Sequence, residues 1–197
     1  TILLAILSYL ILFVLTQSKK WSFVGVALLH LGLFGVNFLR LPPPSLTFIF
    51  WLATLLLFLL FIKNKDKKYA IGGSISFGLL FSIYPYYWTF YVVLFGVFLA
   101  LSFLLRVPDF TYKKYFSIFG VALLVGIPYF ISLWQSIHLE GYAESMARLG
   151  MIHTHFPSGI DSVVVAGLVI CIFIFSYWKN VVLINEKNIF IFSGVLA

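Results

Sequence analysis

The chain has 197 residues, of which 62% are hydrophobic, 20% are aromatic and only 10% are charged. A soluble domain of this size could not bury so much apolar surface, so the composition excludes a water-soluble globular protein and indicates lipid as the surrounding solvent. The net charge of +7 is spread over short gaps between apolar runs. That spread excludes a nucleic-acid-binding protein and favours contact with membrane lipid.

The apolar runs follow one another along the chain and predict an all-α, polytopic transmembrane helical bundle. About seven spans and the start of an eighth are expected, at residues 1–17, 21–39, 45–62, 69–84, 86–105, 115–134, 160–178 and 189–197. Most of these runs reach the roughly 17–25 helical residues that cross a bilayer core. No repeat or long polar linker separates them, so we expect residues 1–197 to form a single membrane domain of a longer chain.

The basic residues predict the orientation of this bundle. Eleven of the 13 Lys and Arg residues fall in alternate gaps between the runs, and only Arg40 and Arg148 fall in the others. This bias is the positive-inside pattern of helical membrane proteins. We therefore expect an integral protein of a plasma or inner membrane, with loops 18–20, 63–68, 106–114 and 179–188 in the cytoplasm.

The apolar stretch 69–105 is too long for one span, because a single helix of this length would extend about 55 Å. Basic clusters flank it on both sides, which requires an even number of crossings. We therefore predict a hairpin that turns at residues 84–88, where Pro85 ends the first helix and suits the first turn of the second.

Short polar or small residues predict how other helices end and pack. Prolines 42–44 are expected to end the second span, and Ser45 to cap the third. The pairs Gly72/Ser76 and Ser74/Gly78 are expected to allow a close approach between helices.

The outer loop 135–159 carries the most informative polar pattern. Leu139, Tyr142 and Met146 recur at helical spacing, while Glu140, Glu144 and Arg148 share another face. We predict a short amphipathic helix over residues 137–149, lying in the outer interface and stopped by Gly150. Glu144 and Arg148 form an ordinary surface pair in one interpretation. In the other, Arg148 binds a lipid-linked phosphate and Glu140 or Glu144 acts as a base.

Two further groups of side chains are candidates for substrate binding. His153 and His155, with His138 nearby in the sequence, lack the Cys or carboxylate that would complete a metal site, so hydrogen bonding is favoured over a divalent metal. No cofactor is predicted. Tyr86 and Trp88 in the hairpin turn suit an aromatic platform for a sugar ring or an isoprenoid chain, or else the aromatic belt of the membrane interface.

The sequence also resembles a known superfamily. The stretch 72–105, with its aromatic hairpin YPYYW, followed by GIPYFISLWQSIHLEGYAESMARLG at 126–150, is similar to polytopic proteins related to the C-type (GT-C) glycosyltransferases. The resemblance implies a multispanning enzyme that moves a sugar from a polyprenyl-phosphate carrier to an acceptor at the outer face. It also implies a catalytic carboxylate in the first outer loop. Residues 41–44 contain none, so no catalytic residue is carried over: either that group lies upstream of Thr1, or this protein shares only the scaffold.

Three functions follow from these patterns. No Asp, Glu, Lys or Arg lies in the middle of a predicted span, which argues against an ion-coupled transporter. A glycosyltransferase of the GT-C type is favoured. A carrier or flippase for a lipid-linked glycan, and a non-catalytic assembly or sensor module, are the alternatives.

Overall fold

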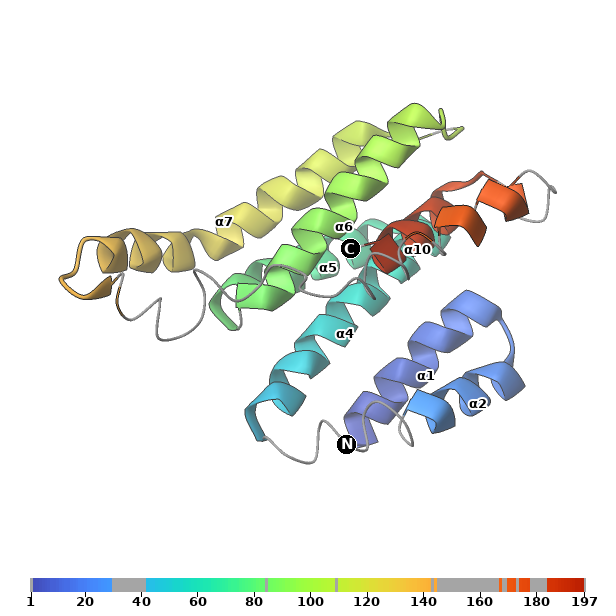
Figure 1. Ribbon diagram of the computed structural model, residues 1–197, viewed down its shortest axis with the longest axis horizontal. Helices are drawn as coiled ribbons and strands as arrows, with labels where there is room; N and C mark the ends of the chain where they lie inside the picture. The colour runs from blue at the N-terminus through green and yellow to red at the C-terminus, as the bar shows by residue number, and fades with distance from the viewer. Residues whose placement is uncertain are drawn as a thin grey trace. The chain divides into compact units, whose positions relative to one another are not determined.

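The computed structural model describes residues 2–29, 42–83, 85–108, 110–142, 144, 167, 170–172, 174–177 and 184–196. Every regular element in these ranges is an α-helix, as the composition predicts (Figure 1). The elements are α1 (Ile2–Thr16), α2 (Lys19–Leu29), α4 (Pro42–Asn64), α5 (Lys67–Ile83), α6 (Pro85–Leu104), α7 (Tyr112–Ile137) and α10 (Glu186–Leu196). Described residues of the predicted span 160–178 are helical as well.

The contacts divide the chain into two compact units. The first unit comprises Thr1–Tyr91 and Thr111–Val125, and the second comprises Val92–Phe110 and Gly126–Ala197. Each unit has its own buried core, described below.

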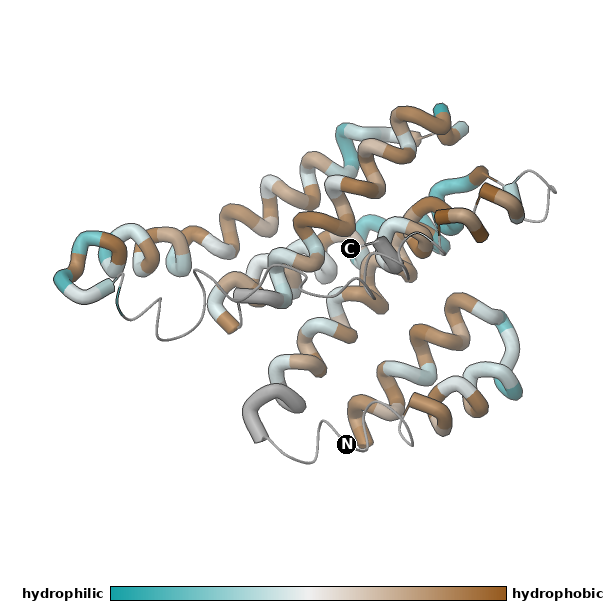
Figure 2. The backbone as a smooth tube through the Cα atoms, viewed as in Figure 1, coloured by the Kyte–Doolittle hydropathy of each residue, from teal (hydrophilic) through white to brown (hydrophobic). Residues whose placement is uncertain are grey.

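Three described helices are long and apolar enough to cross a membrane: Thr47–Asn64 in α4, Tyr87–Leu104 in α6 and Tyr112–Ile137 in α7. Helix α1 is apolar but has only 15 residues. Figure 2 shows hydrophobic residues along the α1–α2 hairpin and hydrophilic ones at its turn. The helices support an integral membrane protein, while a total of about seven spans stays a prediction.

Most helices extend beyond the apolar runs that predicted them. Helix α2 begins at Lys19, α5 at Lys67 and α7 at Tyr112, and α4 ends at Asn64. The predicted cytoplasmic loops were therefore too long, and most of their lysines lie in the first or last turns of helices. The physical reason is that lysine is a good helix former, so backbone hydrogen bonding continues past the point where hydrophobicity stops.

The expectation that Ser45 caps the third span was wrong, because α4 already begins at Pro42 and contains Ser45. The predicted end of the second span lies outside the described residues. Proline suits the first helical turn, where its missing N–H would have no partner within the helix and its fixed φ is already helical. The prolines thus start α4.

The hairpin between the fourth and fifth runs is confirmed as two helices. Helix α5 ends at Ile83 and α6 begins at Pro85, which occupies the first helical position as predicted. The side of the membrane on which this turn lies stays a prediction.

The core of the first unit is a cluster of aromatic rings from α4, α5 and the first part of α6. The Phe77 and Tyr91 rings have centroids 5.6 Å apart, and the Phe58 and Tyr91 rings 6.0 Å apart. All three side chains are buried. The Tyr91 hydroxyl donates a hydrogen bond to the Trp51 carbonyl oxygen at 2.6 Å, so the polar end of this ring is satisfied within the apolar core.

Helix α5 approaches α4 closely at Gly73, which was not among the predicted residues, and α7 closely at Gly78, which was. A Cβ atom added at Gly73 would lie 2.7 Å from Phe58 Cε1 in α4. One added at Gly78 would lie 2.5 Å from Val125 Cβ and 2.7 Å from the Ala122 carbonyl oxygen in α7. The hydroxyls of Thr54 and Ser76 share a hydrogen bond of 2.6 Å between α4 and α5. Close backbones and a polar bond are typical of helix association in lipid.

The second unit is built on the C-terminal part of α6 and on α10. Phe98 and Phe190 have ring centroids 5.3 Å apart, and Phe95 and Phe190 5.9 Å apart. Ile189 and Ser193 on α10 are fully buried. Helix α10 begins at Glu186, three residues before the predicted eighth run at 189, because Asn185 caps it through a hydrogen bond from the Asn188 N–H.

Substitution of Gly78 tests the close approach of α5 to α7. Gly78→Ala should destabilise the protein by about 1–3 kcal/mol, because the new methyl group meets backbone and a β-branched side chain. Gly72→Ala in the same helix is the matched control, since its Cβ would sit 3.7 Å from Leu57 in ordinary contact. Thermal unfolding in detergent measures both. Equal melting temperatures for the two variants would contradict the packing.

Cysteine accessibility tests the orientation of the hairpin. In a Cys171→Ser background, a membrane-impermeant maleimide should label Tyr86→Cys from outside the cell. It should label Asn64→Cys only after permeabilisation, because the neighbouring lysines are expected in the cytoplasm. Labelling of both positions from one side would rule out the predicted crossing.

Candidate functional site

Three helices of the first unit begin with a pair of lysines. The pairs are Lys19-Lys20 in α2, Lys67-Lys68 in α5 and Lys113-Lys114 in α7, and the first turns of these helices carry no acidic residue. The positive end of a helix dipole favours acidic side chains, and a lysine there is unfavourable by about 0.3–1 kcal/mol. Helix stability therefore does not explain the lysine pairs, whereas the positive-inside pattern predicted from the sequence accounts for lysines at these helix ends.

The turns that precede α2 and α5 have similar backbones. Gln17 follows α1 with φ of 55°, and Lys65 follows α4 with φ of 58°. Each donates its N–H to a carbonyl four residues earlier, Gln17 to Phe13 at 2.9 Å and Lys65 to Phe61 at 2.7 Å. A helix end with this left-handed conformation normally carries glycine, and any other residue at that position costs roughly 1–2 kcal/mol. Lys65 thus has a backbone conformation that is unfavourable for lysine.

Two side-chain contacts bring the basic helix ends of the first unit together. Lys63 Nζ donates a hydrogen bond to Gln17 Oε1 at 3.0 Å, which joins the end of α4 to the α1–α2 turn. The buried rings of Phe61 and Tyr115 have centroids 5.8 Å apart, which joins the end of α4 to the start of α7. We call Lys63, Lys65 and Lys114 the lysine cluster.

The positive charge of Lys114 acts on Lys65. Burial lowers the pKa of the Lys65 ammonium below its usual value, and the positive charge of Lys114 lowers this pKa further. Asp66, the carboxylate in the same turn, accepts the Lys68 backbone N–H and pairs with Lys68 Nζ at 3.0 Å. It thus caps α5 and holds its own lysine. The cluster concentrates positive charge at one end of the unit.

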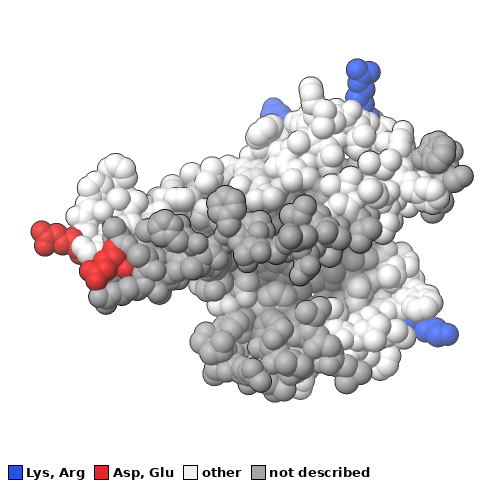
Figure 3. All heavy atoms as spheres, viewed as in Figure 1, with Lys and Arg blue, Asp and Glu red and all other residues white. Residues whose placement is uncertain are grey.

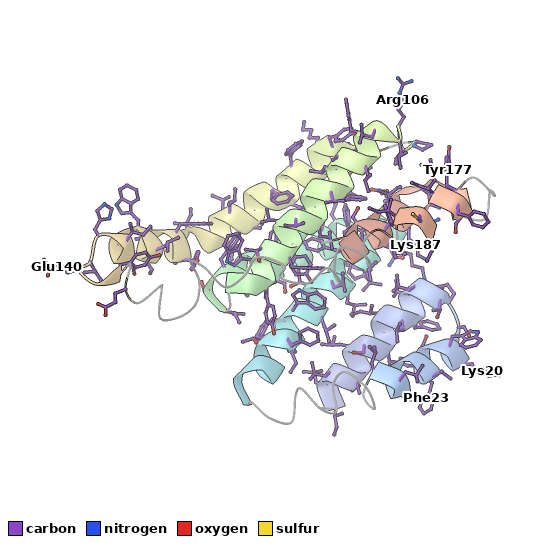
Figure 4. The ribbon with its side chains drawn as sticks, in the orientation of Figure 1. Lys20, Phe23, Arg106, Glu140, Tyr177 and Lys187 are labelled. Carbon is purple, nitrogen blue, oxygen red and sulfur yellow. The ribbon has the colours of Figure 1, made fainter. Side chains whose placement is uncertain are left out.

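Other charged side chains also stand at helix ends. Figure 3 shows Lys and Arg atoms projecting at the ends of helices and mostly uncharged atoms along them. Figure 4 labels Lys20 at the outer edge of the α1–α2 hairpin. In the second unit, Arg106 follows α6 in a left-handed conformation, and the Val107 N–H bonds to the Ser102 carbonyl oxygen at 3.1 Å.

The predicted amphipathic helix at 137–149 required correction. Helix α7 continues to Ile137, and residues 138–141 then form a turn in which Gly141 has φ of 84°. Tyr142 and Glu144 lie in the helical conformation that follows. Glu140 and Glu144 are therefore not one turn apart on a single helix, because the left-handed glycine separates them. Both carboxylate side chains are exposed, and Figure 4 places Glu140 at the tip of this segment.

Several predicted site residues lie outside the described part of the chain. Arg148, His153 and His155 belong to this group, and Tyr86 is described only as a helical residue at the start of α6. The Trp88 ring packs on Phe81 with centroids 5.1 Å apart. Its Nε1 is buried and has no hydrogen-bond acceptor among the described atoms. Trp88 thus belongs at least in part to the packing of the first unit.

His138 has a local role in the structure. Its Nδ1 lies 2.7 Å from the Trp134 carbonyl oxygen, and the two rings have centroids 4.8 Å apart. The described residues contain no group of three or more His, Cys, Asp or Glu side chains that could hold a metal ion.

The sequence analysis treated the lysines only as markers of topology and missed their convergence. One signal was readable, since a lysine pair lies in the first turn of three separate helices. The contact between the end of α4 and the start of α7 was not readable, because it joins residues far apart in the chain.

Chemical labelling tests the environment of Lys65. The neutral amine reacts with acetic anhydride, so Lys65, whose pKa is lowered, should be half-modified at a lower pH than Lys68. The Asp66 carboxylate raises the pKa of Lys68 by hydrogen bonding to its ammonium. Peptide mass spectrometry across pH 7–11 measures both, a range chosen to cover roughly the titration of lysine. Lys114→Gln should move the Lys65 profile toward higher pH and leave Lys68 unchanged; identical profiles for Lys65 and Lys68 would contradict the cluster.

Comparison with known proteins adds no relative. No family model, curated protein or solved structure matches the chain.

Proposed function

We propose that the chain is the membrane-spanning part of a glycosyltransferase of the GT-C type. It would act on a polyprenyl-phosphate-linked sugar at the extracytoplasmic face. The observation that carries the proposal is the placement of charge along α7. Lys113 and Lys114 lie at the start of this helix, and the exposed carboxylates Glu140 and Glu144 follow its other end.

Helix α7 is long enough for the two groups of charged residues to reach opposite membrane surfaces. Its 26 residues extend about 39 Å at 1.5 Å per residue, which exceeds the roughly 30 Å of the hydrocarbon core. The two ends of α7 therefore suit opposite membrane surfaces. Because lysines favour the cytoplasmic surface, the carboxylates are expected at the outer one.

The apolar helices favour chemistry at the surface rather than within the membrane. Charged residues in the three candidate spans occur only near their ends, as Lys63 in α4 and as Lys113 and Lys114 in α7. A conduit for ions or protons requires ionisable groups at depth. An enzyme that meets a lipid-linked substrate in the interface does not. The charge distribution thus supports a transferase over a coupled transporter.

The polar residues that follow α7 in the sequence suit the phosphate and the sugar of such a substrate. A guanidinium forms paired hydrogen bonds with phosphate, which fits Arg148 to the phosphate of the carrier. Glu140, Glu144, His153 and His155 can hydrogen-bond sugar hydroxyls, and aromatic side chains such as Tyr142, Tyr86 and Trp88 can pack on a sugar ring or an isoprenoid chain. These residues are assigned to substrate binding, and no catalytic base is assigned.

The reaction itself is a substitution at the sugar. The acceptor hydroxyl attacks the anomeric carbon while the bond from that carbon to the phosphate oxygen breaks. The electron pair stays with the polyprenyl phosphate, and the hydroxyl proton passes to a base. Negative charge grows on the phosphate as this bond breaks, so an arginine held against it stabilises the transition state more than the ground state.

Substitution of Arg148 tests the proposal. Transfer of radiolabelled sugar from its polyprenyl phosphate is measured with the full-length protein in vesicles. Arg148→Lys keeps the charge but loses the paired geometry and should reduce transfer roughly tenfold, and Arg148→Ala should reduce it further. Arg40→Lys, at the other predicted outer arginine, is the matched control and should leave transfer unchanged.

Two results would overturn the proposal. One is unchanged transfer by both Arg148 variants at normal protein levels. The other is movement of the intact lipid-linked sugar between leaflets without transfer, which would identify a carrier instead.

A further inference from the structure

We propose that the lysine cluster, Lys63, Lys65 and Lys114, is a binding site for the phosphate of an anionic membrane lipid. The site lies at the ends of α4 and α7 in the first unit. It does not depend on the proposed transferase activity, because none of its residues belongs to the segment that follows α7.

Two contacts from different helices hold the cluster together. The buried Phe61 and Tyr115 rings, 5.8 Å apart, join α4 to α7 one turn before Lys65 and one residue after Lys114. The hydrogen bond from Lys63 to Gln17 orients a third ammonium group at the α1–α2 turn. The helix packing therefore preorganises these lysines, so a ligand would not need to gather them from flexible segments.

The chain accepts unfavourable local conformations to keep lysine at these positions. Lys65 has a left-handed backbone that glycine would adopt more easily, and Lys114 belongs to a lysine pair at the positive end of a helix dipole. Burial lowers the pKa of Lys65, and the positive charge of Lys114 adds a smaller effect in the same direction. A bound anion would offset the unfavourable electrostatics of the helix dipole and of the neighbouring positive charges.

The surroundings favour a lipid over a free phosphate. The cluster stands at the ends of two helices that are long and apolar enough to span the bilayer, which is the depth of lipid headgroups. Phe116 and Leu123, seven residues apart on α7, are 63% and 49% exposed. They lie on one helix face, which continues along the apolar helix from Lys113, one turn before Phe116, and not from Lys114. Acyl chains can cover this face, whereas an inorganic phosphate leaves it bare.

Lipid-induced stabilisation tests the site. The purified full-length chain in a neutral detergent is titrated with phosphatidylglycerol, with phosphatidylcholine and with inorganic phosphate, and thermal unfolding is followed at each concentration. A ligand that binds the folded state raises the melting temperature in proportion to its saturation. Phosphatidylglycerol should raise the melting temperature, and the other two ligands should not.

The double variant Lys65→Gln/Lys114→Gln is the critical comparison. Each lysine near an anionic surface contributes about fivefold to affinity, so the pair should weaken the apparent Kd for phosphatidylglycerol roughly 25-fold. Lys19→Gln/Lys20→Gln is the matched control, because it removes the same charge from α2, outside the lysine cluster, and should leave the Kd within about twofold if the cluster is a defined site. Lys65→Arg/Lys114→Arg retains the charge and should retain binding, which excludes misfolding as the cause of a loss.

Each contrary result has a definite meaning. Equal stabilisation by phosphatidylcholine would overturn the requirement for an anion. Equal stabilisation by inorganic phosphate would overturn the lipid as its source. An equal loss of binding in both glutamine double variants would show a diffuse surface charge rather than a site. Loss of binding in the arginine variant with unfolding at low temperature would assign the lysines a structural role and reject the proposal.

Discussion

The need to satisfy backbone hydrogen bonds in an apolar solvent constrains everything else in this protein. Water is not available in the bilayer to pair with free N–H and C=O groups, so a spanning segment must bond internally as a helix. Every regular element among the described residues is accordingly a helix. Polar side chains then accumulate where the helices end. Gln17, Lys65 and Arg106 follow α1, α4 and α6 in left-handed conformations, and the lysine pairs open the next helices in the first unit.

Close packing converts these helix ends into a defined surface. Lipid provides little hydrophobic driving force between helices, so association depends on contact between backbones and on polar bonds. Gly73 and Gly78 let α5 meet α4 on one side and α7 on the other, while Thr54 and Ser76 share a hydrogen bond. The same packing seats Phe61 against Tyr115. The lysine cluster therefore exists because of the apolar core beneath it.

Two of the sequence predictions failed for the same reason, because they assigned structure from local pattern alone. The segment 137–149 has helical periodicity, but Gly141 with φ of 84° divides it, and periodicity does not register such a break. Ser45 was assigned as a helix cap, although proline suits a helix start, and α4 begins three residues earlier at Pro42. The hairpin at Pro85 was predicted correctly because helix length and charge parity both required two helices there.

The sequence by itself determined the all-helical class, the apolar runs behind α4, α6 and α7, and the close approach at Gly78. It could do so because hydrophobicity, helix propensity and the size of a side chain are properties of single residues or short windows. Only the tertiary structure decided which helix ends meet, how Lys63 reaches Gln17, and that Phe61 before Lys65 packs against Tyr115 beside Lys114. These contacts join residues up to about fifty positions apart, and a pattern along the chain carries no information on distances of that kind.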